Sequence, residues 1–186
     1  MSSVNSKIEE ITVQGVFLYQ AYGIWLELVH PNSNSKFEKV LEIHRELFTV
    51  LLESLFSSMV ITMAALCERK RSDVLSIHSI VIELENIYPD LRPKIEEIMS
   101  PIESEIELLY QLRHKVYAHR DKDISPESVF SLVNMSPERI HCCISSILSA
   151  LDIINVAVGL RPEFGATMEA LNKTREVENS LSVLLS

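Results

Sequence analysis

The stretch LFTVLLESLFSSMVITMAAL, residues 47–66, decides the fold class of this protein. It is long enough for a helix of several turns, and Glu53 is its only charged residue. Polar side chains recur along it at intervals of four residues, as Thr49, Glu53 and Ser57 and as Ser54, Ser58 and Thr62. That spacing places polar groups on one side of a helix. We therefore predict a central bundle helix with one closely packed small-residue face, and not a membrane span.

Helical patterns continue on both sides of this stretch. Apolar spacing and turn residues predict helical segments at about 5–30, 36–70, 72–86, 90–119, 125–134, 136–159 and 166–185. The sequence has only four glycines, and its β-branched residues rarely alternate with polar ones. We predict an all-α, up-and-down bundle of five to six helices that forms a single domain over residues 1–186.

Several helix boundaries are indicated by their residue types. Two Ser-Pro-Glu sequences, beginning at Ser125 and Ser136, are typical helix starts, and Gly159 is typical of a helix end. We expect Ser72 to cap another helix. A kink or restart is expected at the Ser100-Pro101-Ile-Glu103 sequence, whose Ser and Glu have the spacing of a capping box.

The composition limits the classes of function. The net charge is -9, from 17 basic and 26 acidic residues, so the chain as a whole is a poor binder of duplex nucleic acid. Any contact with RNA must come from a local basic patch. The three cysteines have no Cys-x-x-Cys spacing and are predicted to be reduced and mostly buried. Together with an N-terminus unlike a signal peptide, they favour a cytoplasmic protein with no metal site.

One segment reverses the overall charge. Residues 111–122 contain four basic residues and one acidic residue, Asp121, alongside two histidines. The basic residues are Arg113, Lys115, Arg120 and Lys122, and the histidines are His114 and His119. An imidazole can move protons at neutral pH, and a guanidinium can hold a phosphate by two hydrogen bonds. The segment is therefore the candidate site for chemistry on RNA.

The spacing within this segment sets a condition on its geometry. Arg113 and His119 are six residues apart, so on a regular helix they differ by about 120° in direction and about 9 Å in height. They do not share one face. A long arginine side chain, a frayed last turn or a second protomer is needed to bring both groups to one phosphate.

The segment resembles the Arg-x4-6-His motif of HEPN domains, in which a polar residue follows the arginine. Here Arg113 is followed by His114, and His119 closes the motif. The longer form Leu-Arg-His-Lys-Val-Tyr-Ala-His-Arg-Asp is similar to the AbiU-like branch of abortive-infection proteins. The resemblance implies a homodimer with a composite ribonuclease site that needs no metal or cofactor and leaves 2',3'-cyclic phosphate ends.

The same resemblance implies roles for the residues. Arg113 would hold the phosphate, His119 would be the acid and base, and His114 would orient or assist. The basic patch of Lys115, Arg120 and Lys122 would bind RNA. The family further implies a toxin or phage-defence setting, with an antitoxin or other regulatory protein as a partner.

Two other interpretations stay open at the level of sequence. A HEPN-like dimer could bind a nucleotide, RNA or a protein without cutting anything, because Arg and His also serve phosphate binding. A plain helical adaptor is the third, in which His119 is only a favourable cation at a helix C-terminus. The second basic run, Arg69-Lys70-Arg71, is either an extension of an RNA track or a solvated helix end. Tyr22 and Trp25 are expected in the core or an interface.

Overall fold

The computed structural model describes residues 2–29, 40, 42–71, 73–114 and 136–160. Its helices are α1 (Ser2–Val29), α3 (Arg45–Leu66), α4 (Ile77–Leu84), α5 (Leu91–Met99), the short 3-10 helix η1 (Ser100–Ile102), α6 (Glu103–Leu112) and α8 (Pro137–Ala157). Within these residues no β-strand is present. The predicted all-α class is confirmed. The predicted helices at 125–134 and 166–185 lie outside the described residues.

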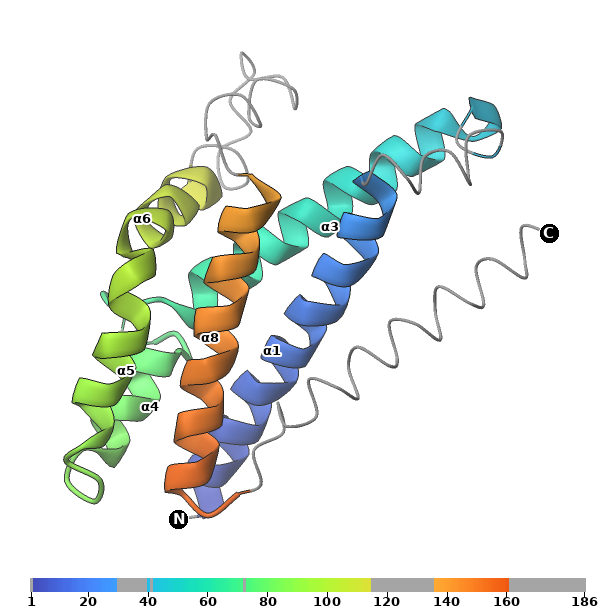
Figure 1. Cartoon of the computed structure of the whole chain (residues 1–186). Coiled ribbons are helices and arrows are strands. Elements are labelled where there is room, and N and C mark those ends of the chain that lie inside the picture. Colours follow the sequence, from blue (N-terminus) through green and yellow to red (C-terminus); the bar gives the residue numbers. More distant parts are fainter. Residues whose placement is uncertain (1, 30–39, 41, 72, 115–135, 161–186) are drawn as a thin grey trace.

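The helices form a bundle in which neighbouring elements alternate in direction (Figure 1). α1 packs against α3 and α8, α5 packs against α8, and α6 packs against α3. Each helix contributes apolar side chains to one continuous core, among them Leu18, Met63, Ile80, Leu109 and Leu151. The burial of these side chains removes apolar surface from water and is the main stabilising contribution to the fold.

A buried polar contact joins two of the core helices. Thr12 of α1 and Asn155 of α8 lie within hydrogen-bond distance, with the Asn155 Nδ2 donating to the Thr12 Oγ1 at 3.3 Å. Both residues are buried. The aromatic residues Tyr22 and Trp25 of α1 are also buried and stack on each other, which confirms that they belong to the core.

Only part of α3 lies in this core. Its buried residues belong to the C-terminal half, namely Phe56, Met59, Val60, Met63, Ala64 and Leu66. None of the six polar positions of residues 49–62 is buried, so the prediction of a closely packed small-residue face is wrong within the described chain. Helix α3 buries its larger apolar side chains instead, because these remove more apolar surface from water.

Two helices are long and apolar enough to cross a membrane by length and composition, α3 and residues Glu138–Ala157 of α8. In the bundle, both helices supply side chains to the core. Core helices of soluble proteins commonly meet the same criterion, so composition alone does not separate the two environments.

The helix boundaries test the predicted capping residues. Ser136 caps α8 and accepts a hydrogen bond from the Arg139 backbone N–H, as its Ser-Pro-Glu sequence predicts. Gly159 follows the helix with a φ of 76°, a left-handed conformation that favours glycine. As expected, the helix is interrupted at Ser100, where the 3-10 turn η1 separates α5 from α6.

Other boundary predictions are wrong. Helix α4 is capped by Ser76, whose hydroxyl accepts from the Ser79 N–H while the Ser79 hydroxyl accepts from the Ser76 N–H. This reciprocal pair fixes the start of α4 at Ile77, later than the start expected after Ser72, which itself lies outside the described residues. The predicted capping box at Ser100 does not form, since Ser100 donates to the Glu97 carbonyl. The predicted helix 36–70 has a turn at His44 and ends at Leu66.

Candidate functional site

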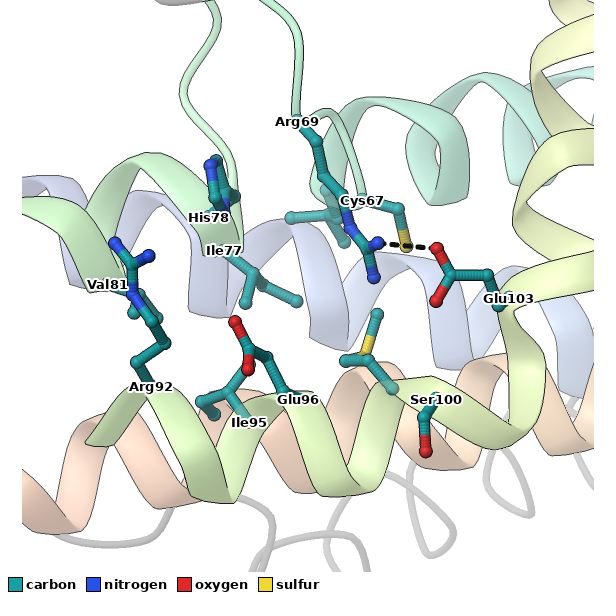
Figure 2. A pocket seen from close by; sticks show the side chains of 12 residues that line it. Cys67, Arg69, Ile77, His78, Val81, Arg92, Ile95, Glu96, Ser100 and Glu103 are labelled. Carbon is teal, nitrogen blue, oxygen red and sulfur yellow. Dashed lines mark hydrogen bonds and ion pairs between the residues drawn. The ribbon is translucent and has the colours of Figure 1, made fainter. Parts of the chain in front are cut away.

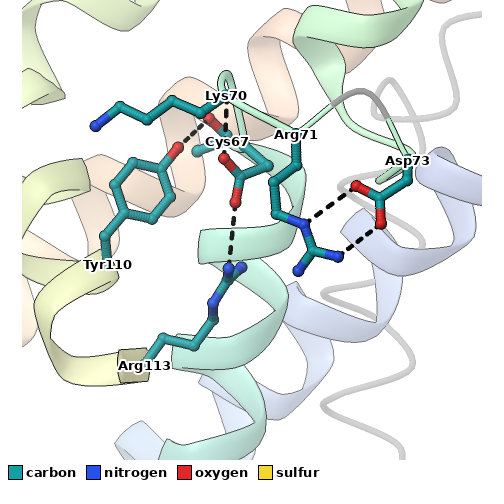
Figure 3. Close-up of polar contacts among 7 residues, drawn as sticks. Cys67, Lys70, Arg71, Asp73, Tyr110 and Arg113 are labelled. Atoms are coloured by element: carbon teal, nitrogen blue, oxygen red, sulfur yellow. Dashed lines mark hydrogen bonds and ion pairs between the residues drawn. The ribbon is translucent and has the colours of Figure 1, made fainter. Parts of the chain in front are cut away.

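Arg113, the first residue of the predicted motif, follows the last residue of α6 at one end of the bundle. The helical backbone widens to a π-type turn at Arg113 and His114, a distortion that is frequent at functional sites. The Arg113 Nη2 donates to the Glu68 Oε2 at 3.2 Å (Figure 3). The side chain of Arg113 is 29% exposed and that of Glu68 only 6%. The arginine therefore reaches from a protected carboxylate toward the surface.

Glu68 follows the C-terminal end of α3 and is a buried acidic residue. Its Oε2 accepts from Arg113, and its Oε1 accepts from the Lys70 backbone N–H at 3.1 Å. A carboxylate that is removed from water is costly unless it is paired and hydrogen-bonded. Arg113 and the Lys70 N–H satisfy this requirement together.

Helix α6 holds the connection after α3 at two further points. The Tyr110 hydroxyl donates to the Cys67 carbonyl (Figure 3), and Arg69 Nη1 lies 2.6 Å from the Glu103 Oε1. Three side chains of α6 and its end, Glu103, Tyr110 and Arg113, thus contact the consecutive residues 69, 67 and 68. We call these three side chains the α6 clasp.

Burial affects the titration of groups inside the clasp. It raises the pKa of the Tyr110 hydroxyl, and the nearby Cys67 and Glu68 raise it further. Burial also raises the pKa of the Cys67 thiol to about 12 and that of the Cys143 thiol to about 12. These two thiols stay protonated at neutral pH and are poor nucleophiles. Cys142 is exposed, so the expectation of buried cysteines holds for Cys67 and Cys143 only.

The structure brings the Arg69-Lys70-Arg71 run close to Arg113, the one basic residue of the segment 111–122 that it describes. Arg69, Lys70 and Arg71 lie in the connection after α3, next to the Glu68 carboxylate that Arg113 contacts (Figure 3). Arg71 is itself paired with Asp73, at 2.6 Å between Nη2 and Oδ2. The run begins three residues beyond the last residue of α3 and is exposed, and two of its three cations have acidic partners.

The remaining predicted site residues differ in how far they can be placed. His114 follows Arg113 in the widened turn and is exposed. His119, the predicted acid and base, and the predicted RNA-binding residues Lys115, Arg120 and Lys122 lie outside the described residues. Among the residues that are described, no cluster of three or more His, Cys, Asp or Glu side chains could hold a metal ion.

The chain matches no protein-family model, no curated protein and no solved structure. The HEPN resemblance therefore stays a prediction that rests on the motif and the helical class.

Glu68 and Tyr110 were missed at the level of sequence. The pairing of Glu68 with Arg113 spans 45 residues, and no periodicity relates positions in different helices. The only available indication was compositional, since Glu68 is an acid directly before a run of three cations. A run of charges does not indicate which residue Glu68 pairs with, because a sequence does not distinguish a buried carboxylate from an exposed one.

The arrangement can bind an anion at Arg113. A guanidinium has five N–H donors, and within the described part of the chain Glu68 is the only hydrogen-bond partner of the Arg113 side chain. The Glu68 contact fixes one edge of the group and leaves other donors for a phosphate oxygen. Fixing an arginine in this way lowers the loss of side-chain entropy when it binds a ligand.

Proposed function

We propose that this protein is a metal-independent endoribonuclease of the HEPN kind, acting as a cytoplasmic homodimer in a toxin or phage-defence system. The proposal is supported by the Arg113-His114-x4-His119 sequence and by the all-α bundle in which it lies. The observation that carries it is the position of Arg113, a guanidinium held by a buried carboxylate at the end of a core helix.

The chemistry requires two kinds of group. His119 takes the proton from the 2'-hydroxyl, the 2'-oxygen attacks phosphorus, and the bond to the 5'-oxygen breaks as that oxygen receives a proton. The products are a 2',3'-cyclic phosphate and a 5'-hydroxyl. Arg113 binds the non-bridging oxygens and offsets the negative charge that grows in the transition state. His114 assists, and the basic patch of Lys115, Arg120 and Lys122 holds the strand.

A second candidate is a silent binding module for RNA, a nucleotide or a protein. The Glu68–Arg113 ion pair favours it, because a carboxylate 3.2 Å from the guanidinium offsets the positive charge with which Arg113 would stabilise a transition state. In that case the pair mainly stabilises the bundle, and any ligand binds without being cut.

Cleavage of RNA in excess EDTA tests the proposal. Purified protein is incubated with a mixed RNA and a labelled tRNA, and the fragments are separated on a denaturing gel. We expect the wild type to give fragments with 2',3'-cyclic phosphate ends, and His119→Ala to lower the rate by about 10²–10⁴-fold, as the loss of an acid–base group does.

The matched control is His44→Ala, since His44 is exposed before α3 and its side chain makes no capping hydrogen bond. It should cleave like the wild type. Equal activity of the wild type and His119→Ala across many RNAs would contradict the proposed mechanism. A wild type that binds RNA but yields no product favours the silent module.

A further inference from the structure

A pocket lies between the end of α3, helix α4 and the α5–η1–α6 rod (Figure 2). Its volume is about 300 Å³, at the lower end of the range for small-molecule sites. Ile77, Val81 and Ile95 give it a buried apolar floor. This size and floor suit a compact, flat or aliphatic ligand.

Helix α5 supplies two charged groups to the pocket. Arg92 and Glu96 are four residues apart and so lie on the same face of that helix. The Arg92 Nη2 pairs with the Glu85 Oε2 at 2.8 Å, whereas its Nε is buried and has no hydrogen-bond partner in the described structure. Buried donors without a partner are rare in folded proteins and call for an explanation.

Glu96 supplies a hydrogen-bond acceptor to the pocket. Its carboxylate projects between the side chains of Arg92 and Arg69 in the pocket (Figure 2), and no described residue donates a hydrogen bond to it. A carboxylate can accept two hydrogen bonds side by side. The pocket therefore offers the carboxylate of the exposed Glu96 as an acceptor beside the guanidinium of Arg92, above an apolar floor.

His78 adds a group that is neutral at physiological pH. Burial lowers its pKa, and the cations Arg92 and Arg69 lower it further. A neutral imidazole can donate with one nitrogen and accept with the other. The pocket thus presents carboxylates as well as cations, which suits a neutral ligand with both donors and acceptors better than a simple anion.

We propose that this pocket binds the guanine base of an unpaired RNA nucleotide. Guanine is flat, and it carries N–H donors on its Watson–Crick edge that match the two oxygens of Glu96. Its O6 and N7 are acceptors that arginine commonly binds, here the guanidinium of Arg92, whose side chain is 36% exposed. Proteins that select an RNA sequence usually take unstacked bases into such sites and bind their edges.

The position of the pocket connects it to Arg113. Cys67 and Arg69 line the pocket, and Glu68 between them holds Arg113. A base in the pocket and a phosphate at Arg113 would therefore both lie next to residues 67–69. The inference rests in this respect on the proposed ribonuclease function, for which the pocket would select the nucleotide beside the cleaved bond.

Binding of GMP to the full-length protein tests the proposal without requiring activity. Titrations with GMP, AMP, CMP and UMP are followed by calorimetry and by amide chemical shifts. We expect GMP to bind more tightly than the other three. Glu96→Gln should weaken GMP binding by about tenfold or more, since hydrogen bonds to a charged acceptor are lost. The control Glu97→Gln alters a neighbouring exposed carboxylate outside the pocket and should bind like the wild type.

Each result decides the matter. No GMP binding, equal binding of all four nucleotides, or GMP binding that Glu96→Gln leaves unchanged would overturn the proposal, provided that circular dichroism shows the variants folded. GMP binding that Glu96 controls supports it even if no RNA is cut, in which case the ribonuclease function alone fails. If the protein cuts RNA without a preference for guanine and does not bind GMP, the pocket proposal fails and the ribonuclease function stands.

Discussion

The two ends of α3 have similar apolar sequences but opposite surroundings. At the C-terminal end, Met63 and Leu66 are completely buried, and the α6 clasp holds the residues that follow. At the N-terminal end, Leu47 is 65% exposed and Val50 is 60% exposed. In Figure 1 this end of α3 projects away from α6 and α8. Helix formation therefore does not decide burial; the neighbouring helices do.

The two ends of α3 therefore contribute differently to the stability of the fold. Removal of a group from the buried end leaves a cavity or an unpaired charge, which is costly. The exposed end contributes little to the stability of the monomer. It does present a row of apolar side chains, and a proposed homodimer could bury such a row.

A pair of truncations should give the largest contrast. Met63→Ala is expected to lower the free energy of unfolding by about 2–5 kcal/mol, because the side chain is fully buried. Leu47→Ala should change it by less than about 0.5 kcal/mol at protein concentrations that keep the chain monomeric. Urea unfolding followed by circular dichroism measures both values. Equal losses would show that the N-terminal end is covered in solution.

Arg113→Ala should have the next largest effect, since it leaves the buried Glu68 carboxylate without its cation. We expect a loss of about 2–4 kcal/mol in unfolding free energy, below the upper values for fully buried pairs because Arg113 is 29% exposed. The double variant Arg113→Ala with Glu68→Gln should regain part of that loss. A double variant no more stable than Arg113→Ala would show that the unpaired charge is not the cause.

Alkaline pH should weaken the buried end by a smaller amount. An exposed cysteine thiol has a pKa of 9.0, and burial raises the pKa of the Cys67 thiol to about 12 in the fold. Above pH 9 the unfolded chain releases this proton while the folded chain keeps it, so the free energy of unfolding falls as pH rises toward 12. The raised pKa of Tyr110 acts in the same direction.

Urea unfolding between pH 8 and pH 11 measures this slope. Cys67→Ala should reduce it, and Leu47→Ala should leave it unchanged. A slope that is the same in the wild type and Cys67→Ala would place the responsible groups elsewhere, for example at Cys143, whose thiol is also buried.

Local sequence predicted the helical class and several boundaries. The Ser136 cap, the break at Ser100 and the glycine at position 159 depend on neighbouring residues only, so their physical causes are visible in the sequence. The side of α3 that packs was predicted wrongly. Both sides of that helix carry apolar or small residues, and the choice between them is made by α1, α6 and α8.

The candidate site was predicted less completely for the same reason. Arg113 was identified because its motif is contiguous, whereas its carboxylate partner Glu68 comes from another helix end. The pocket at Arg92 and Glu96 combines residues from three regions of the chain, and no motif marks it. Long-range contacts of this kind need the packed bundle before they can be recognised.

The α6 clasp has a consequence for how the chain tolerates change in length. Its three residues, Glu103, Tyr110 and Arg113, each contact a different residue of the connection after α3. Insertion of one residue between Glu103 and Tyr110 would rotate the last two by about 100° and advance them by about 1.5 Å. Two of the three contacts would be lost together. The clasp thus fixes the rotational register of α6, and insertions or deletions should be absent from this helix during evolution even where substitutions accumulate.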